Sequence, residues 1–151
     1  MSRYVIVSFL EKATLGITFS KSEWLLHLTI LRPFFSDNED GYLIGILKDS
    51  LLEKQKVTST GKVKEMFGPN KDVAVTELEH NTRIQDLHDS IESAFKPFIR
   101  FESEQYPTYR PHVTNQGSRG IVVGEEVVIN SVSLVKIDND SRQVLATVAL
   151  I

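Results

Sequence analysis

The sequence predicts an α+β fold whose sheet is mostly antiparallel. Short strand patterns occur in pairs separated by turn residues, which is typical of antiparallel hairpins. Two amphipathic helix patterns are interspersed with these pairs and do not alternate with single strands. Each half of the chain also carries one helix and one strand with the pattern histidine–apolar–threonine. This echo indicates an internal repeat, which can define a whole architecture.

The predicted elements follow one another as strand, strand, helix, hairpin, helix, strand and hairpin. The strands are predicted by runs rich in β-branched and aromatic residues, which are residues 3–9, 24–31, 62–67, 73–78, 109–114, 127–137 and 144–151. Residues typical of turns, at 68–71 and 138–141, connect the two strands of each predicted hairpin. Residues 12–22 read as a connection, and Pro33 ends the second strand or places it at an edge.

Both helices are predicted from apolar residues at helical spacing. Ser36 and Thr82 each stand three residues before a Glu or Gln, which is the spacing of a capping box, and they are the predicted N-caps. The first helix is expected to run to about Lys54, and Pro97 ends the second. His88 lies beside the apolar stripe of the second helix, where we expect it to be partly exposed.

Composition limits the possible functions. The 151 residues suit a single domain, 1–151, and the 41% hydrophobic and 25% charged residues are ordinary for a soluble protein. The absence of cysteine excludes disulfides, thiol nucleophiles and cysteine-bound zinc. A net charge of −3 disfavours binding to long duplex nucleic acid. With no signal peptide and no apolar run of membrane-spanning length, we expect a cytoplasmic monomer that does not bind membranes.

Two triplets, His27-Leu28-Thr29 and His112-Val113-Thr114, are the candidate functional residues. Residues i and i+2 of a strand point to the same face. Each triplet therefore places an imidazole beside a hydroxyl and turns an apolar residue to the other face. His80-Asn81-Thr82 has the same spacing, but its middle residue is polar and it stands at a predicted helix start. Context, and not spacing alone, separates the two strand triplets from this third one.

This set of side chains suits phosphodiester chemistry. One neutral imidazole can take a proton from water or a hydroxyl, and the other, as imidazolium, can give a proton to the leaving oxygen. The threonine hydroxyls can donate to the non-bridging phosphate oxygens. The scheme requires no metal ion and no cofactor. The acidic runs at 37–40 and 138–140 stand where a helix cap and a turn are needed, and neither has a calcium-loop pattern.

The segments WLLHLTIL at 24–31 and YRPHVT at 109–114, with Pro111 directly before the second histidine, resemble the two-histidine (2H) phosphoesterase superfamily. That superfamily includes RNA 2',5'-ligase-like proteins and cyclic nucleotide phosphodiesterases. The order of helix, hairpin and helix between the motifs also matches, and the resemblance covers most of the chain. It implies a bilobal fold with pseudo-two-fold symmetry, helices on the outside, and the two motif strands facing each other across a central cleft.

The resemblance also implies an activity. His27 and His112 would be the acid–base pair, and Thr29 and Thr114 would hold the phosphate. The substrate would be a 2',3'-cyclic phosphate or a 2',5' linkage in RNA or a nucleotide, which is hydrolysed or transferred. Two departures bear on which substrate fits. Residues 12–22 are shorter than the helix that family members often have there, and Asn115 follows the second motif where an aliphatic residue is common.

Residues flanking the second motif are candidates for substrate binding. Tyr106 and Tyr109 have rings that can stack on a base, and Arg110 and Arg119 have guanidinium groups that can pair with a phosphate. The alternative is that Tyr109 packs beside the sheet and both arginines are solvated. Trp24 is expected in the core.

Two other functions remain open at this point. One is a non-catalytic module that binds nucleotides or RNA ends on the same fold, with the imidazoles serving only as hydrogen-bond donors. The other is a protein-interaction domain that has lost its nucleotide site. Turnover and nucleotide binding distinguish the three possibilities.

Overall fold

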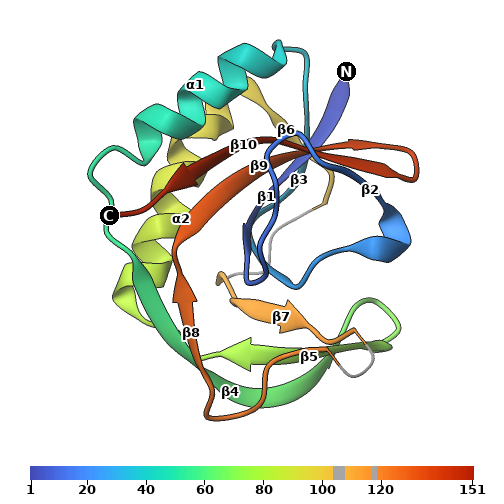
Figure 1. Cartoon of the computed structure of the whole chain (residues 1–151), viewed down its shortest axis with the longest axis vertical. Coiled ribbons are helices and arrows are strands. Elements are labelled where there is room, and N and C mark those ends of the chain that lie inside the picture. The colour runs from blue at the N-terminus through green and yellow to red at the C-terminus, as the bar shows by residue number, and fades with distance from the viewer. Residues whose placement is uncertain (104–107, 117–118) are drawn as a thin grey trace.

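The computed structural model describes residues 1–103, 108–116 and 119–151. Within these residues the strands form an antiparallel sheet in the order β2-β10-β9-β1-β3-β7-β5-β4-β8, with β6 beside β3. The two α-helices lie together on one side of this sheet (Figure 1). The predicted α+β class, the mostly antiparallel sheet and the outer position of the helices are therefore confirmed. No helix in the described part is long and apolar enough to cross a membrane.

The bounds of the elements are as follows. The strands are β1 (Ser2–Phe9), β2 (Thr18–Ser20), β3 (His27–Ser36), β4 (Val57–Phe67), β5 (Val73–Leu78), β6 (Arg100–Phe101), β7 (His112–Thr114), β8 (Glu126–Ile129), β9 (Ser131–Asp138) and β10 (Ser141–Ala149). The helices are α1 (Asp40–Ser50) and α2 (Thr82–Phe95), with short 3-10 turns η1 (Lys21–Glu23) and η2 (Lys96–Phe98).

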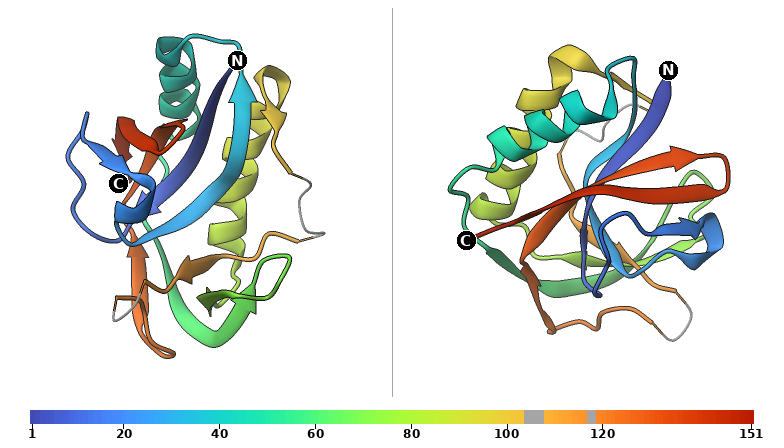
Figure 2. Two further views of the ribbon diagram at one scale, coloured as in Figure 1. Left: turned by 90° about the vertical axis from the view of Figure 1, so that its right-hand side faces the viewer. Right: turned by 45° about the horizontal axis from the view of Figure 1, so that its top comes forward.

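The sheet is arranged about the neighbouring strands β3 and β7. Outward from β3 follow β1, β9 and β10, and outward from β7 follow β5, β4 and β8. Each motif strand therefore has three further strands on its own side, and β2 adds a short fourth beside β10. Figure 2 shows the two halves of the sheet from two directions. Because β8 leads into β9 through Asn130 alone, the chain passes directly from one half into the other.

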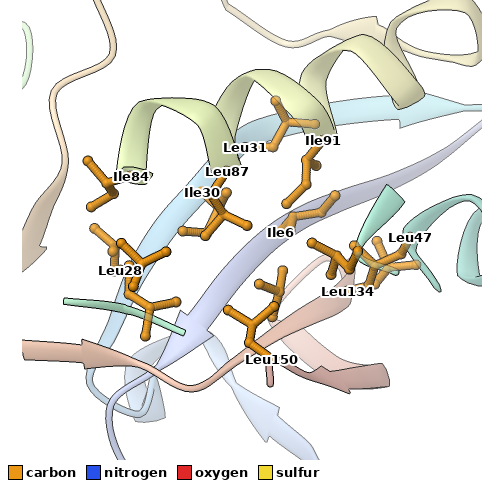
Figure 3. Packing of buried hydrophobic residues seen from close by; sticks show 14 of the residues in the cluster. Ile6, Leu28, Ile30, Leu31, Leu47, Ile84, Leu87, Ile91, Leu134 and Leu150 are labelled. Carbon is orange, nitrogen blue, oxygen red and sulfur yellow. The ribbon is translucent and has the colours of Figure 1, made fainter. Parts of the chain in front are cut away.

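The main core lies between the sheet and the helices. Leu28 and Ile30 of β3 are buried beside Ile84, Leu87 and Ile91 of α2 (Figure 3). Burying each such aliphatic side chain contributes about 1.5–3 kcal/mol. This packing covers one face of the motif strand β3 and leaves its opposite face available for a site.

Several strand boundaries differ from the predicted ones. β3 continues through Pro33 to Ser36, so the expectation that this proline ends the strand is wrong. The register between β1 and β3 shifts between the pairs Tyr4–Phe34 and Ile6–Leu31, and a bulge tolerates a residue without an N–H group. The connection 12–22 contains β2, which pairs with β10. The pattern at 127–137 divides at Asn130 into two strands, and that at 109–114 is a strand only from 112 onward.

Neither predicted helix cap is correct. Ser36 belongs to β3, where its Oγ donates to the Phe98 carbonyl, and Glu39 is the residue that precedes α1. Asn81 caps α2, because its side chain accepts a hydrogen bond from the Ile84 amide at 2.9 Å, and Thr82 is the first helical residue. At α2, a cap by Asn81 and a capping box that starts at Thr82 produce similar sequence patterns. The sequence therefore does not show which of these two neighbouring residues is the N-cap.

α1 also ends earlier than predicted, at Ser50. Glu53 then takes a left-handed conformation with φ of 60°, which is incompatible with continuing the helix to Lys54.

The acidic runs have structural partners. Asp40 in the first turn of α1 accepts a hydrogen bond from the Tyr4 hydroxyl at 2.7 Å and pairs with Lys136 at 3.1 Å. These contacts tie α1 to β1 and β9. Asn139 lies in the turn between β9 and β10 with φ of 52°, a conformation that Asn tolerates well. Among the described residues, no three histidine or carboxylate side chains lie close enough together to hold a metal ion.

Candidate active site

The two motif strands are direct neighbours in the sheet. β3 and β7 run antiparallel with Leu28 opposite Val113. In this register His27 lies opposite Thr114, and Thr29 lies opposite His112. We call these four side chains the motif face. The two motif strands thus lie side by side, and their functional side chains share one face.

The burial pattern of both triplets agrees with this arrangement. Leu28 and Val113 are completely buried, whereas the histidine and threonine of each triplet are half-buried. The apolar middle residues therefore anchor the two strands in the core, and the polar residues on either side point the other way. Both strands therefore show the alternation of polar and apolar faces that the sequence pattern predicts.

The two imidazoles stand on a diagonal of the motif face. Diagonal neighbours on adjacent strands lie roughly 7–8 Å apart, with their Cβ atoms somewhat closer, which aromatic and long side chains can bridge. Burial is the main cause of the lowered pKa of His27, and the charge of His112 lowers it further. The diagonal places the threonines at the other two corners, so a tetrahedral group at the centre would have an imidazole on each of two opposite sides.

Each imidazole is held by the backbone in the same way. Nδ1 of His27 is 2.8 Å from the Leu25 carbonyl, and Nδ1 of His112 is 2.8 Å from the Arg110 carbonyl. A carbonyl oxygen only accepts hydrogen bonds, so Nδ1 carries the hydrogen in both rings. Nε2 is therefore the atom that can exchange a proton with a substrate, as an acceptor when neutral and a donor when charged.

The pKa values of both histidines lie below the usual 6.5, and burial is the main cause. In each ring the hydrogen bond to the backbone carbonyl opposes this effect. The pKa of His112 is also raised by the Glu77 carboxylate and lowered by the Arg110 guanidinium. Both rings are therefore mainly neutral at pH 7 in the free protein, and a bound phosphate anion would favour protonation.

Aromatic rings flank both imidazoles. The Trp24 ring centroid is 4.4 Å from that of His27, and the Phe67 centroid is 4.6 Å from that of His112. Trp24, which was expected in the core, is half-buried and packs against a second cluster of buried residues that includes Val7 and Val135. Phe67 and Glu77 were not identified from the sequence. Glu77 reaches this region only because β5 pairs with β7 and brings it opposite His112.

Tyr109 connects the second helix to the first motif. Its hydroxyl donates to the Thr29 carbonyl at 2.7 Å, and its ring stacks on His88 with centroids 4.2 Å apart. Burial raises the pKa of this hydroxyl. His88 is 3% exposed, so the expectation that it is partly exposed is wrong. These contacts give Tyr109 a role in positioning β3, in agreement with the alternative that Tyr109 packs beside the sheet.

Both candidate arginines are paired with carboxylates, and Arg119 is also exposed to solvent, as the alternative held. Arg110 donates to both oxygens of Glu77, at 2.9 and 3.1 Å, and its guanidinium lies over the Phe67 ring. Arg119 pairs with Glu11, far away in sequence. Tyr106, the other flanking candidate, lies outside the described residues.

The third triplet is not part of the sheet. His80 is exposed directly before α2, and its Nε2 lies 2.6 Å from the Gln85 side-chain oxygen. The contextual distinction drawn from the sequence is therefore correct, and His80 provides a natural control for the two motif histidines.

Comparisons with known proteins identify the fold. No family model and no curated protein matches the chain. Among solved structures, a crystal structure of a phosphoesterase matches with a TM-score of 0.63 and 14% identity over 99% of this chain and 98% of that one. E. coli LigT complexed with 3'-AMP matches with a TM-score of 0.65 and 14% identity over the same shares of the two chains. A Thermus thermophilus protein matches with a TM-score of 0.56 and 16% identity over 98% and 97%.

These matches extend over nearly the whole of both chains. The chain has the fold of LigT and of the matched phosphoesterase, and the resemblance noted from the sequence is confirmed at the level of the fold. LigT has also been crystallised with NADP+, ATP and phosphate.

Proposed function

We propose that this chain, which has the LigT-like phosphoesterase fold, is a phosphodiesterase of the two-histidine type. It acts on a 2',3'-cyclic phosphate or a 2',5' linkage in RNA or a nucleotide, by acid–base catalysis between His27 and His112. On the same proposal, it works as a cytoplasmic monomer. The observation that carries the proposal is the pairing of Leu28 with Val113, because this pair brings the two imidazoles onto one diagonal.

In the proposed reaction, one imidazole takes up a proton and the other gives one up. For a 2',3'-cyclic phosphate, Nε2 of one neutral ring takes a proton from water as the water oxygen attacks phosphorus. The bond from phosphorus to one ribose oxygen breaks, and Nε2–H of the other, charged ring gives that oxygen its proton. The attacking and leaving oxygens lie on opposite sides of phosphorus in such a displacement, so acid and base are needed on opposite sides. The diagonal of the motif face supplies this arrangement.

The threonines complete the site. Thr29 and Thr114 occupy the remaining two corners, where their hydroxyls can donate to the non-bridging phosphate oxygens. Hydrogen bonds aimed at oxygens that gain negative charge stabilise the transition state more than the ground state. The nucleotides in the LigT structures support a nucleotide-sized substrate for this fold.

The test is a comparison of single alanine variants at three histidines. His27→Ala and His112→Ala should each lower kcat for nucleoside 2',3'-cyclic phosphates by about 10²–10⁴-fold, the contribution typical of a general acid or base. His80→Ala is the matched control and should leave kcat unchanged, because His80 lies outside the sheet. Circular dichroism should show all three variants folded.

Two outcomes would contradict the proposal. Unchanged turnover in either motif variant would reject its catalytic role. Tight binding of nucleotides without turnover of any cyclic or 2',5'-linked substrate by the native protein would instead support the non-catalytic binding module.

A further inference from the structure

The indole ring of Trp24 lies over the imidazole ring of His27. The two ring centroids are 4.4 Å apart, and the angle between the ring planes is 34°. Two rings that met side by side would have more distant centroids, and an edge-to-face pair would have a steeper angle. The imidazole therefore lies against the face of the indole, where the π electrons are concentrated. This is the geometry of a cation–π contact whenever His27 carries a proton.

Trp24 is held in this place by β2 and η1. β2 pairs with β10 (Figure 1), and directly after it the Lys21 amide donates to the Asp140 carbonyl at 2.6 Å. Trp24 follows η1 directly. Its ring also meets the Phe19 ring of β2 edge to face, with centroids 5.1 Å apart. The position of the indole is thus set by the half of the sheet that carries the first motif.

Within the described residues, no carboxylate stabilises the charged form of His27. Its Nδ1 binds the Leu25 carbonyl, which is uncharged. From β1, Phe9 stands opposite in register, 6.3 Å away between centroids and at 65° to the imidazole plane. From β7, His112 acts on His27 as a like charge. From β10, the Arg142 guanidinium lies 5.9 Å from the indole centroid.

The two motif histidines therefore differ in what stabilises their charge. His112 has the carboxylate of Glu77, which raises its pKa. The ring beside His112 is Phe67, which meets the imidazole at the steep angle of 61° and has the Arg110 guanidinium over its own face. For His27, the group in the equivalent place is the face of the indole.

We propose that Trp24 acts on the reaction through His27, because the face of its indole stabilises the charged form of that imidazole. In the proposed reaction, His27 is charged either before it gives a proton to the leaving oxygen or after it takes one from water. Trp24 is thus a positioning residue that assists His27 in either role. Its effect on turnover rests on the proposed function, whereas the contact between the two rings does not.

The first test measures the proton affinity of His27 in two leucine variants, by NMR titration of the imidazole ring signals. Trp24→Leu removes the indole face and keeps an apolar side chain. It should weaken proton binding by about two- to fivefold, so that the pKa of His27 falls. The smaller side chain also reduces burial, and since burial lowers the pKa of His27, this second effect has the opposite sign. A fall can therefore come only from the lost indole face.

Phe9→Leu is the matched control. Phe9 is also half-buried beside His27, but its ring is too distant for a cation–π contact, which extends to about 6 Å from the ring centroid. Phe9→Leu should therefore leave the pKa of His27 unchanged or raise it. Trp24→Phe should give a pKa between those of the native protein and Trp24→Leu, because a phenyl face is a weaker partner for a cation than an indole face. An unchanged or raised pKa in Trp24→Leu, or an equal fall in Phe9→Leu, would overturn the inference.

A second readout is the fluorescence of Trp24, which is the only tryptophan of the chain. A charged imidazole quenches the fluorescence of an indole in contact with it. The emission should therefore fall as the pH is lowered through the pKa of His27, and this change should be absent from His27→Ala. In His112→Ala it should persist and move to higher pH, because the charge of His112 lowers the pKa of His27. The same pH-dependent change in His27→Ala as in the native protein would contradict the contact.

Turnover separates a positioning role from a merely structural one. In Trp24→Leu, the part of the pH profile of kcat/KM that belongs to His27 should move to lower pH, while the part that belongs to His112 stays in place. A loss of kcat/KM that is equal at every pH would show a structural role only and would overturn the inference. If the native protein turns over no phosphodiester, the proposed function fails, and the NMR and fluorescence titrations still decide whether Trp24 stabilises charged His27.

Discussion

At the scale of single residues, the two motif histidines are alike in backbone contacts and different in charge. Both bind a carbonyl two residues earlier through Nδ1. Only His112 has a carboxylate, Glu77, that raises its pKa, and an arginine that lowers it. The near-symmetry explains why the sequence alone cannot assign acid and base. The charges near His112 make the two rings experimentally distinguishable.

The lowered pKa values predict the pH dependence of catalysis. In a two-histidine mechanism, kcat/KM rises as the base loses its proton and falls as the acid loses its proton. The maximum lies midway between the two pKa values. Because burial holds both pKa values below 6.5, the maximum of kcat/KM should lie below pH 6.5. The pH of this maximum is measured from initial rates with a nucleoside 2',3'-cyclic phosphate between acid and alkaline pH. A maximum above pH 6.5 would contradict the claim that burial lowers both pKa values.

In this pH profile of kcat/KM, the variant Glu77→Gln identifies which limb, the rising or the falling one, is due to His112. The change removes the negative charge that raises the pKa of His112, so that limb should move to lower pH while the limb of His27 stays in place. Glu79→Gln is the control, because Glu79 lies beyond the end of β5. If neither limb moves, Glu77 has no electrostatic influence on the reacting group.

At the scale of elements, the start of α2 depends on one side chain. Asn81 accepts from the Ile84 amide, and the helix begins directly after it. Asn81→Ala should therefore lower the free energy of unfolding by about 1 kcal/mol, whereas Thr82→Ala should have a much smaller effect. Denaturant unfolding measures both. Because neither residue is part of the motif face, kcat/KM should stay at its native value in both variants; a larger loss in Thr82→Ala would restore Thr82 as the cap.

The same helix supports the site from behind. His88 of α2 stacks on Tyr109, and Tyr109 binds the Thr29 carbonyl. The helix is therefore connected to the first motif through the segment that precedes the second motif. This contact explains the conformation of Tyr109 without requiring it to touch a substrate.

At the scale of the whole molecule, the segment 121–125 closes over β4 at a glycine. Gly61 donates to the Glu125 carbonyl and accepts from Gly124. A Cβ atom at Gly61 would stand 2.4 Å from the Val122 carbonyl oxygen. This close approach fixes the segment that leads into β8 and β9, and hence the connection between the two halves.

Gly61→Ala should destabilise the protein by about 1–3 kcal/mol, the usual cost of forcing extra volume into a packed site. Gly45→Ala is the matched change in α1, where a Cβ meets nothing within 4 Å, and it should stabilise by about 0.5–1 kcal/mol. Thermal or denaturant unfolding of both variants measures the difference. Equal effects of the two changes would show that β4 and this segment can move apart without cost.

The residues of the motif face could be predicted from local sequence patterns alone. His27, Thr29, His112 and Thr114 follow from a period of two around an apolar residue, and the strand environment separated them from His80. That period is a local property of the backbone, so it is readable from neighbouring residues. The α+β class and the hairpins were predictable for the same reason.

The identity of neighbouring strands could not be predicted in this way, because it depends on contacts between distant parts of the chain. The pairing of Leu28 with Val113 and of Glu77 with His112 joins residues far apart in the chain. These pairings set the diagonal of the imidazoles, brought Glu77 to His112, and turned Arg110 toward a carboxylate. Packing of the whole core selects such long-range pairs, because every strand must bury its apolar face against the helices or a neighbouring strand in the same structure. No local pattern around Glu77 or Phe67 records that selection.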